Sequence, residues 1–378
     1  MKPDRLIRVL VADDSSLVRE MVCDILTSDP AISIAGEAAD GIEAVAKALS
    51  LKPDIITMDI EMPLLSGLEA ISRIMAVNPV PILVITSLSG VRTAFDAVSK
   101  GALDVVEKSD IDPEDASRLV KKVKMLAGVD VVAHQIAMGI RIDQPNTNHI
   151  SSSGSILNGY PISDTDTKPF IQSNKTDALT RSSIIKRRIV AIASSTGGPN
   201  ALCTILSKLP ATFPAPIVIA QHVAAGFTQG MAEWLNTRTP LDVTSARNGE
   251  VTSSGKVYLN PSESDMRVTR HGVILLSNGG EHQLYHPSCD HLFRSVAESF
   301  GQHSVGIILT GMGSDGVAGI KAIQSAGGAT LAQDEHSSVV FGMNGLAVSQ
   351  GAVQRVLTLD MIPDYLMNML DYVRGVDI

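Results

Sequence analysis

The fold of the C-terminal half is decided by the stretch Ile189-Val190-Ala191-Ile192-Ala193-Ser194-Ser195-Thr196-Gly197-Gly198-Pro199. Its first five residues form an apolar run of strand length, and the helical pattern of Ala201–Lys208 follows the glycines. Pro199 suits the first turn of a helix, and the glycines let backbone N–H groups approach a bound group closely. The stretch therefore predicts a strand, a tight turn and a helix whose N-terminus favours an oxyanion near Ser195.

Two other apolar runs in this half also end at residues that can carry chemistry. Pro216–Ala220 leads to His222, and Val305–Leu309 leads to Asp315. Because the carboxyl ends of parallel strands share one edge of a sheet, we expect Ser195, His222 and Asp315 to converge. A serine nucleophile, a histidine base and an aspartate that orients the imidazole predict a serine hydrolase.

The residues alone leave other interpretations of this half open. Ser194 and Thr196 are rival nucleophiles by position, and a single histidine is more often a hydrogen-bonded polar group than a base. Asp315 is also placed to cap the helix predicted over Val317–Ala326. Nucleotide binding is the weaker alternative, since no G-x-G-x-x-G motif and no acidic partner for a ribose are evident.

Apolar runs also alternate with helical patterns in the N-terminal half. Such alternation predicts crossover units on a parallel sheet, here with five strands and five helices. The runs are Leu6–Ala12, Ser16–Thr27, Ile32–Gly36, Gly41–Leu49, Ile55–Met58, Leu68–Val77, Ile82–Thr86, Val91–Ser99, Leu103–Glu107 and Pro113–Leu126.

Five residues at the ends of these predicted strands are expected on one edge of that sheet. They are Asp13, Asp14, Asp59, Thr86 and Lys108. Each has an ordinary explanation, such as a helix cap, a strand end or a solvated lysine. Together they predict three carboxylates whose repulsion is offset by Mg²⁺ and the lysine, with Asp59 accepting a phosphoryl group and Thr86 donating a hydrogen bond to it.

Composition limits the class of protein. The length of 378 residues predicts two domains, and 44% hydrophobic but 3% aromatic residues fit buried parallel strands. Forty acidic against 31 basic residues, a net charge of -9, argue against nucleic acid as a ligand.

Three unpaired cysteines and no apolar segment of signal or membrane length predict a cytoplasmic protein. The polar composition of 143–180 predicts a flexible linker.

The N-terminal motifs resemble the receiver domain of two-component response regulators. This resemblance implies a flavodoxin-like fold, phosphorylation of Asp59 by a histidine kinase, Mg²⁺ held by Asp13, Asp14 and Asp59, and switch roles for Thr86 and Lys108. Val105 and Ser109 depart from it, because receivers commonly carry an aromatic residue and a proline there. The motifs are Val11-Ala12-Asp13-Asp14-Ser15, Met58-Asp59-Ile60-Glu61-Met62-Pro63 with Gly67, and Gly101-Ala102-x-Asp104 ahead of Lys108.

The C-terminal motifs resemble the catalytic domain of chemotaxis protein-glutamate methylesterases, a doubly wound α/β hydrolytic domain. The resemblance selects Ser195 as nucleophile, and it departs at Ala193-Ser194, at 260–264 and at Asn344. The motifs are Ser195-Thr196-Gly197-Gly198-Pro199, Gln221-His222 with Ala225-Gly226-Phe227, Pro287-Ser288-x-Asp290-x-Leu292-Phe293, Thr310-Gly311-Met312-Gly313-x-Asp315-Gly316, and Ala332-Gln333-Asp334-Glu335 with 338–343.

This second resemblance implies hydrolysis of glutamate methyl esters on chemoreceptors, release of methanol, and deamidation of particular receptor glutamines, without a metal or organic cofactor for the ester step. The backbone of Thr196, Gly197 and Met312 is expected to bind the oxyanion. We expect a receiver at 1–127, a linker at 128–186 and a catalytic domain at 187–378, with inhibition relieved when Asp59 is phosphorylated. Association with membranes would be peripheral, through the receptors. The alternative is a receptor-binding adaptor that has lost catalysis.

Overall fold

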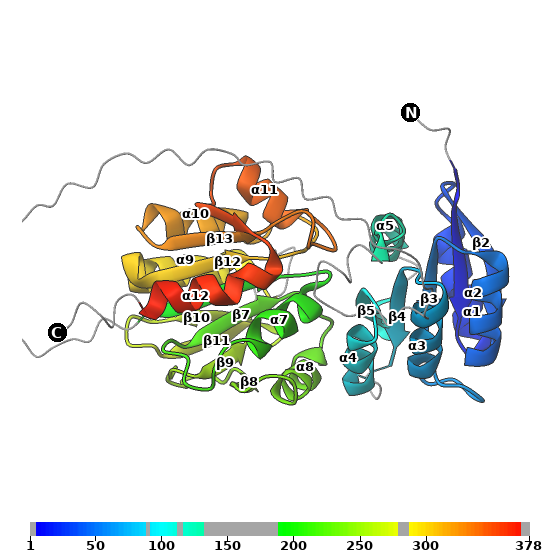
Figure 1. Ribbon diagram of the computed structural model, residues 1–378, viewed down its shortest axis with the longest axis horizontal. Coiled ribbons are helices and arrows are strands. Elements are labelled where there is room, and N and C mark those ends of the chain that lie inside the picture. The colour runs from blue at the N-terminus through cyan, green and yellow to red at the C-terminus, as the bar shows by residue number, and fades with distance from the viewer. Residues whose placement is uncertain (1–4, 88–90, 112–115, 132–187, 279–286, 372–378) are drawn as a thin grey trace, which may run out of the picture. The chain divides into compact units, whose positions relative to one another are not determined.

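A computed structural model describes residues 5–87, 91–111, 116–131, 188–278 and 287–371 (Figure 1). The N-terminal part is a five-stranded sheet in the order β2-β1-β3-β4-β5, and every strand pair in it is parallel. This is the flavodoxin-like strand order, so the predicted receiver fold is confirmed. The strands are β1 (Ile7–Ala12), β2 (Ile32–Ala38), β3 (Ile55–Met58), β4 (Ile82–Thr86) and β5 (Asp104–Glu107), and the helices are α1 (Ser16–Thr27), α2 (Gly41–Leu51), α3 (Gly67–Val77), α4 (Val91–Ser99) and α5 (Ala116–Leu126).

Side chains just before three of these helices fix where each begins. Ser15, Asp40 and Ser66 accept hydrogen bonds from backbone N–H groups in the first turns of α1, α2 and α3. Such caps satisfy donors that have no partner within the helix. Strands β3 and β4 are buried along their whole length, as expected for parallel strands with helices on both faces.

The C-terminal part contains a seven-stranded parallel sheet in the order β14-β13-β12-β6-β7-β9-β8 and an antiparallel hairpin of β10 and β11. Its strands are β6 (Ile189–Ser194), β7 (Ile217–Gln221), β8 (Asp242–Ser245), β9 (Lys256–Leu259), β10 (Ser264–Val268), β11 (Ile274–Asn278), β12 (Ser304–Ile308), β13 (Ala329–Gln333) and β14 (Arg355–Leu357), and its helices are α7 (Gly198–Ser207), α8 (Phe227–Asn236), α9 (Cys289–Phe300), α10 (Val317–Ser325), α11 (Met343–Ser349) and α12 (Ile362–Asp371).

Strand β6 supplies both faces of the second core. Val190 and Ile192 belong to the apolar cluster that includes α7, α8 and α12, whereas Ile189, Ala191 and Ala193 belong to the cluster that includes α9, α10 and α11. Alternate residues of a strand point to opposite faces, so helices cover both sides of β6. The predicted doubly wound fold is therefore confirmed.

The strand order reverses at β6. The chain moves from β6 to β7 on one side and later returns to β12 on the other. In open α/β sheets, ligands bind beside the carboxyl ends of the strands at such a reversal. A functional site is therefore expected at the carboxyl ends of β12, β6 and β7.

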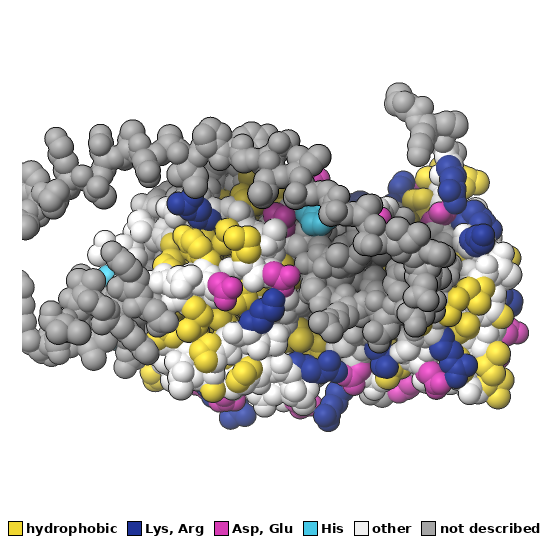
Figure 2. Space-filling view, in the orientation of Figure 1, with side chains coloured by type: hydrophobic (Ala, Val, Ile, Leu, Met, Phe, Trp, Pro, Cys, Tyr) yellow, Lys and Arg dark blue, Asp and Glu magenta, His cyan; other side chains and the backbone are white. Residues whose placement is uncertain are grey.

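The predicted linker falls almost wholly on residues 132–187, which lie outside the described residues, so the domain limits remain predictions. Within the described ranges, no helix combines the length and apolar character of a bilayer span. On the face drawn in Figure 2, Lys and Arg side chains are interspersed with Asp and Glu side chains. Lys208 and Asp360, for example, form an exposed ion pair at 2.6 Å.

Candidate catalytic and phosphoryl-acceptor sites

The pairing of β6 with its neighbours brings Ser195 and His222 to adjacent strand ends. Ser194 pairs with Gln221 in the register of β6 and β7, so the next residues of both strands emerge side by side. The backbone N–H of His222 donates to the carbonyl oxygen of Ser194 at 3.0 Å. On the other side of β6, the N–H of Ser195 donates to the carbonyl oxygen of Thr310 at 3.1 Å. This bond holds the start of the loop that leads to Asp315 against the end of β6.

The surroundings of the three consecutive hydroxyl residues distinguish them as nucleophiles. Ser194 is fully buried and its Oγ donates to Oε1 of Gln221 at 2.5 Å. Thr196 is 3% exposed, whereas Ser195 is only partly buried. Only Ser195 combines the strand-end position with access from outside, which favours it over both rivals.

Gln221 ties the two strand ends together, a role that the sequence analysis did not assign. Its Nε2 donates to the carbonyl oxygens of Ser195 and His222 at 2.8 and 2.9 Å. A Cβ at Gly198 would lie 1.9 Å from Gln221 Oε1, so glycine is required there for the amide to fit. The only sequence signal for this role was a polar residue directly after the apolar run Pro216–Ala220.

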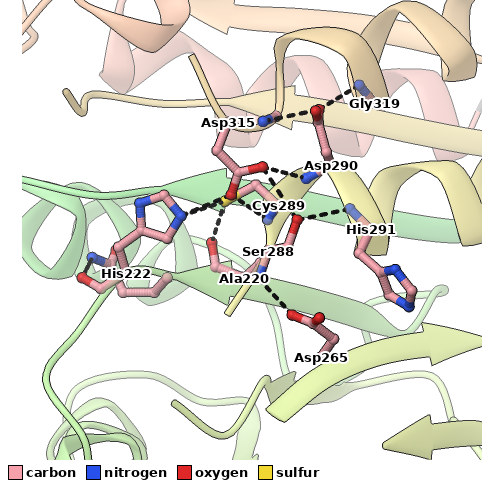
Figure 3. Close-up of polar contacts among 11 residues, drawn as sticks. Ala220, His222, Asp265, Ser288, Cys289, Asp290, His291, Asp315 and Gly319 are labelled. Atoms are coloured by element: carbon pink, nitrogen blue, oxygen red, sulfur yellow. Dashed lines mark hydrogen bonds and ion pairs between the residues drawn. The ribbon is translucent and has the colours of Figure 1, made fainter. Parts of the chain in front are cut away.

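His222 and Asp315 are in direct contact. Nε2 of His222 lies 2.9 Å from Oδ2 of Asp315, and their side chains are 14% and 6% exposed (Figure 3). Burial alone would raise the pKa of Asp315, but the hydrogen bonds from His222 and from two backbone N–H groups hold the pKa below its usual range. An ionised carboxylate only accepts hydrogen bonds, so Nε2 carries the proton and Nδ1 carries the lone pair in neutral His222.

The N-terminus of α9 holds the carboxylate of Asp315 in place (Figure 3). The N–H groups of Cys289 and Asp290 donate to its two oxygens at 2.7 and 2.9 Å, and the Ser288 hydroxyl donates to Oδ1 at 3.3 Å. Ser288 is also the N-cap of α9. Helix N-terminal N–H groups stabilise an anion, which explains why a buried aspartate stays charged here.

Asp290 fixes the loop that carries Asp315. Its Oδ1 accepts hydrogen bonds from the N–H groups of Gly316 at 3.0 Å and Gly319 at 2.6 Å. Burial raises the pKa of Asp290, and the charge of Asp315 adds to this effect. The alternative that Asp315 caps α10 is wrong, because Gly316 is the N-cap and makes no side-chain cap bond.

The thiol of Cys289 lies beside the pair formed by His222 and Asp315. Its Sγ lies 3.5 Å from Nε2 of His222 and 3.6 Å from the carbonyl oxygen of Ala220. Burial raises the pKa of the Cys289 thiol well above its ordinary range, so the thiol is protonated. Neither its position nor its contacts were foreseen from the sequence.

The predicted phosphoryl-acceptor residues also converge. Carboxylate oxygens of Asp13, Asp14 and Asp59 lie within 4.8 Å of one another; Asp13 and Asp59 are buried and Asp14 is exposed. Nζ of Lys108 lies 2.8 Å from Asp13 Oδ2 and 2.9 Å from Asp59 Oδ2. Because the N-cap of α1 is Ser15, the ordinary capping explanation does not account for Asp13 or Asp14.

The electrostatics of this cluster fit a divalent cation. Burial raises the pKa of Asp59 and the charge of Asp13 adds to this, although Lys108 acts in the opposite direction. Burial alone would lower the pKa of Lys108, but its bonds to the two carboxylates raise it. Crowded carboxylate oxygens with one exposed member offer the hard ligands that Mg²⁺ prefers.

Thr86 presents a hydroxyl that the described residues do not satisfy. It ends β4 and is fully buried, and no hydrogen-bond partner for its Oγ1 lies among the residues that the structure describes. A buried donor without an acceptor costs free energy, so its presence calls for an explanation. An oxygen of a group bound at the same edge of the sheet would supply the acceptor.

The departures from the two resemblances are accommodated locally. Val105 is half-buried in β5, and Ser109 lies in the short 3-10 turn Lys108–Asp110. Asn344 is fully buried in α11, where its Nδ2 donates to the carbonyl oxygen of Gln333 at 3.0 Å and to Ser338 Oγ at 2.8 Å. The Asn344 amide therefore crosslinks the end of β13 to the segment that follows it.

These two sites define a class of protein: a response regulator whose receiver is joined to a hydrolase-type domain. Comparison with known proteins gives the particular family. Residues 9–124 match the family model "Response regulator receiver domain", and residues 190–366 match the model "CheB methylesterase". The chain belongs to the family of CheB protein-glutamate methylesterases.

Two curated relatives that match nearly the whole chain agree with this assignment, and one solved structure is similar to the C-terminal part. Protein-glutamate methylesterase/protein-glutamine glutaminase 3 of Paramagnetospirillum magneticum is 41% identical over 93% of each chain. Protein-glutamate methylesterase/protein-glutamine glutaminase 2 of Anaeromyxobacter dehalogenans is 41% identical over 95% of this chain and 96% of its own. The crystal structure of the Thermotoga maritima CheB methylesterase catalytic domain is 35% identical, with a TM-score of 0.47, and covers 48% of this chain and 98% of its own.

Proposed function

We propose that this chain is a phosphorylation-regulated serine hydrolase that removes methyl esters from glutamates of chemoreceptors and deamidates particular receptor glutamines. Curated relatives that span nearly the whole chain carry this pair of activities in their names. The observation that carries the proposal is the 2.9 Å contact between His222 Nε2 and Asp315 Oδ2, one strand end away from Ser195.

In the proposed reaction, Oγ of Ser195 attacks the γ-carbonyl carbon of the ester, and Nδ1 of His222 accepts the hydroxyl proton. Asp315 stabilises the imidazolium that forms. When the tetrahedral intermediate collapses, the proton passes to the methoxide, and methanol leaves. Water then attacks the acyl-serine with His222 again as base, which restores Ser195 and releases the glutamate. With a glutamine substrate, ammonia leaves instead of methanol.

Backbone N–H groups of Thr196, Gly197 and Met312 are proposed to bind the oxyanion. No acceptor for these three N–H groups is found within the described part of the chain. Thr196 and Gly197 lie on the turn that follows β6, and Met312 lies on the loop that follows β12. Preorganised donors of this kind stabilise charge that develops in the transition state.

In the receiver, Asp59 is proposed to accept a phosphoryl group from a chemotaxis histidine kinase. Asp13, Asp14 and Asp59 would hold Mg²⁺, which neutralises charge on the phosphoryl oxygens when bound. Lys108 would pair with one phosphoryl oxygen, and the Thr86 hydroxyl would donate to another. The buried and unsatisfied Thr86 Oγ1 supports this assignment. Ester hydrolysis itself is proposed to need no cofactor.

We further propose a cytoplasmic enzyme that meets membranes only through its receptor substrates, with the unphosphorylated receiver inhibiting the catalytic domain. A hundredfold activation would need a coupling of about 2.7 kcal/mol, within the usual range for allosteric linkage. The competing proposal, a receptor-binding adaptor without catalysis, does not account for a His222–Asp315 pair held in hydrogen-bonding geometry.

Release of methanol from membranes that hold methylated receptor tests the proposal most directly. We expect methanol in proportion to enzyme, and more of it after treatment with acetyl phosphate and Mg²⁺. Receptor binding with no methanol released under either condition would leave only the adaptor.

A further inference from the structure

Cys289 places a thiol next to His222 and Asp315, two members of the proposed triad. Sγ of Cys289, Nε2 of His222 and a carboxylate oxygen of Asp315 all lie within 4.8 Å of one another. Figure 3 marks the contact between the sulfur and the imidazole nitrogen. Sulfur, imidazole and carboxylate together form the ligand set that zinc and similar borderline-soft metals prefer, unlike the all-oxygen cluster of the receiver.

We propose that Cys289, His222 and Asp315 form a binding site for Zn²⁺ or a similar thiophilic divalent cation, and that occupation of this site reversibly switches the hydrolase off. The binding part of this proposal is independent of the proposed function. The inhibitory part rests on the roles proposed for Ser195 and His222.

The spacing of the three ligand atoms suits a tetrahedral metal. Zinc–ligand bonds of about 2.0 to 2.3 Å place neighbouring ligand atoms about 3.5 Å apart. The separation of Cys289 Sγ and His222 Nε2 is 3.5 Å, and that of His222 Nε2 and Asp315 Oδ2 is 2.9 Å. The first of these two separations already suits the metal, and the second would have to widen by about half an ångström.

The carboxylate ligand is already oriented by the protein. Asp315 is held by the N–H groups of Cys289 and Asp290, so it need not be reorganised to coordinate an ion. Cys289 is fully buried, whereas the His222 side chain is 14% exposed. The metal would therefore enter past the imidazole. Three protein ligands would leave the fourth position of a tetrahedral ion to a water molecule, as in other zinc sites with three protein ligands.

Metal binding changes which atoms hold protons. The thiol of Cys289 gives its proton to solvent as the sulfur–metal bond forms. The Nε2 lone pair of His222 is used for the metal, so the neutral ring carries its proton on Nδ1. That nitrogen then donates a hydrogen bond and no longer accepts the proton of Ser195. Removal of the ion by a chelator restores the original tautomer and the base.

Absorption spectroscopy of the full chain with Co²⁺ as the zinc substitute tests the site without any substrate. Excess Mg²⁺ is present to occupy the oxygen cluster of the receiver. We expect a thiolate-to-cobalt charge-transfer band that saturates at one equivalent and disappears on addition of Zn²⁺. The band should be lost in Cys289→Ala and kept in Cys203→Ala, the matched control in the same domain. No band, or a band unchanged in Cys289→Ala, would overturn the site.

Methanol release tests the inhibitory part. Each variant is compared with its own rate in the presence of a chelator, so differences in basal activity do not matter. Zn²⁺ should inhibit the original chain reversibly, and Cys289→Ala should need at least tenfold more Zn²⁺ for half-inhibition. Cys289→Ser, which fills nearly the same volume, replaces the alanine variant if that variant does not fold. A cobalt band with full activity at saturating Zn²⁺ would overturn inhibition, whereas an inactive original chain would implicate the proposed function instead.

Discussion

Nε2 of His222, rather than Nδ1, contacts Oδ2 of Asp315, at 2.9 Å. In the usual serine protease triad the aspartate bonds Nδ1 and the serine faces Nε2, so the imidazole here is used the other way round. His222 follows β7 directly, and its backbone N–H donates to the carbonyl oxygen of Ser194 at 3.0 Å. The end of the ring that faces Asp315 also faces Cys289.

Replacement of Ser195 by alanine should reduce methanol release by roughly a thousandfold or more, because no other hydroxyl at this turn is both accessible and placed at the strand end. Ser194→Ala is the matched control. It removes the hydrogen bond to the buried Oε1 of Gln221 and should cost about 1 to 3 kcal/mol of unfolding free energy while most of the activity remains. Near-complete loss of methanol release in Ser194→Ala, with Ser195→Ala still active, would identify Ser194 as the nucleophile.

The pKa of Asp315 predicts how its contribution to stability depends on pH. Because the pKa of Asp315 in the folded chain lies below 3.8, the ordinary value for an aspartate, the ionised carboxylate stabilises the fold above that pH. This contribution is lost as the pH falls through the folded-state pKa. The difference in unfolding free energy between the original chain and Asp315→Asn should therefore shrink as the pH is lowered from 6 to below 3.8.

Urea unfolding followed by the fluorescence of Trp234, the single tryptophan, measures this difference in the catalytic domain. Acidic groups that do not interact with Asp315 contribute equally to both proteins and cancel in the comparison. Asp290 is the exception, because the charge of Asp315 helps to raise its pKa, so the same pair of proteins is also compared in the Asp290→Asn background. A difference that stays constant across this pH range would mean that the contacts with His222 and α9 do not lower the pKa of Asp315.

Asp290 should behave as a positioning residue. Asp290→Ala leaves the N–H groups of Gly316 and Gly319 without their acceptor, at about 1 to 3 kcal/mol of stability each. The loop that carries Asp315 would shift, so kcat should fall while KM changes little. Asp290→Asn keeps an acceptor oxygen at the same place and should recover much of kcat. Equal losses in the two variants would show that the charge of Asp290 matters more than its hydrogen bonds.

Much of this arrangement follows from the sequence, because buried parallel strands leave continuous apolar runs. The limits predicted for the first helix, Ser16–Thr27, are those observed, and the strand ends at Ser195, His222 and Asp315 were found in the same way. The hairpin of β10 and β11 was not predicted, since Ser264–Val268 alternates too weakly to stand out.

Contacts that depend on register or on ring orientation were beyond the sequence. The pairing of Ser194 with Gln221 is set by how β6 and β7 slide against each other. The support of Asp315 by α9 requires that this helix, which starts 26 residues earlier in the chain, has its N-terminus at this strand edge. The motif around Ser288 was visible, but nothing in it indicated which carboxylate its N–H groups would meet.

Replacement of Thr86 tests whether its hydroxyl acts in signalling or only in the packing of the sheet. Thr86→Val keeps the shape of the side chain but removes the orphan donor, so the free energy of unfolding should stay the same or rise by about 1 kcal/mol. The stimulation of methanol release by acetyl phosphate and Mg²⁺ should nevertheless be lost, because the phosphoryl group loses its hydroxyl donor.

Thr57 provides the matched control for Thr86. It is 2% exposed in β3, and its Oγ1 also has no partner among the described residues, but it lies within the strand rather than at the functional edge. Thr57→Val should give a similar change in stability and leave the response to acetyl phosphate intact. If both variants lose the response, the cause is the packing of the sheet; if neither does, Thr86 has no part in the switch.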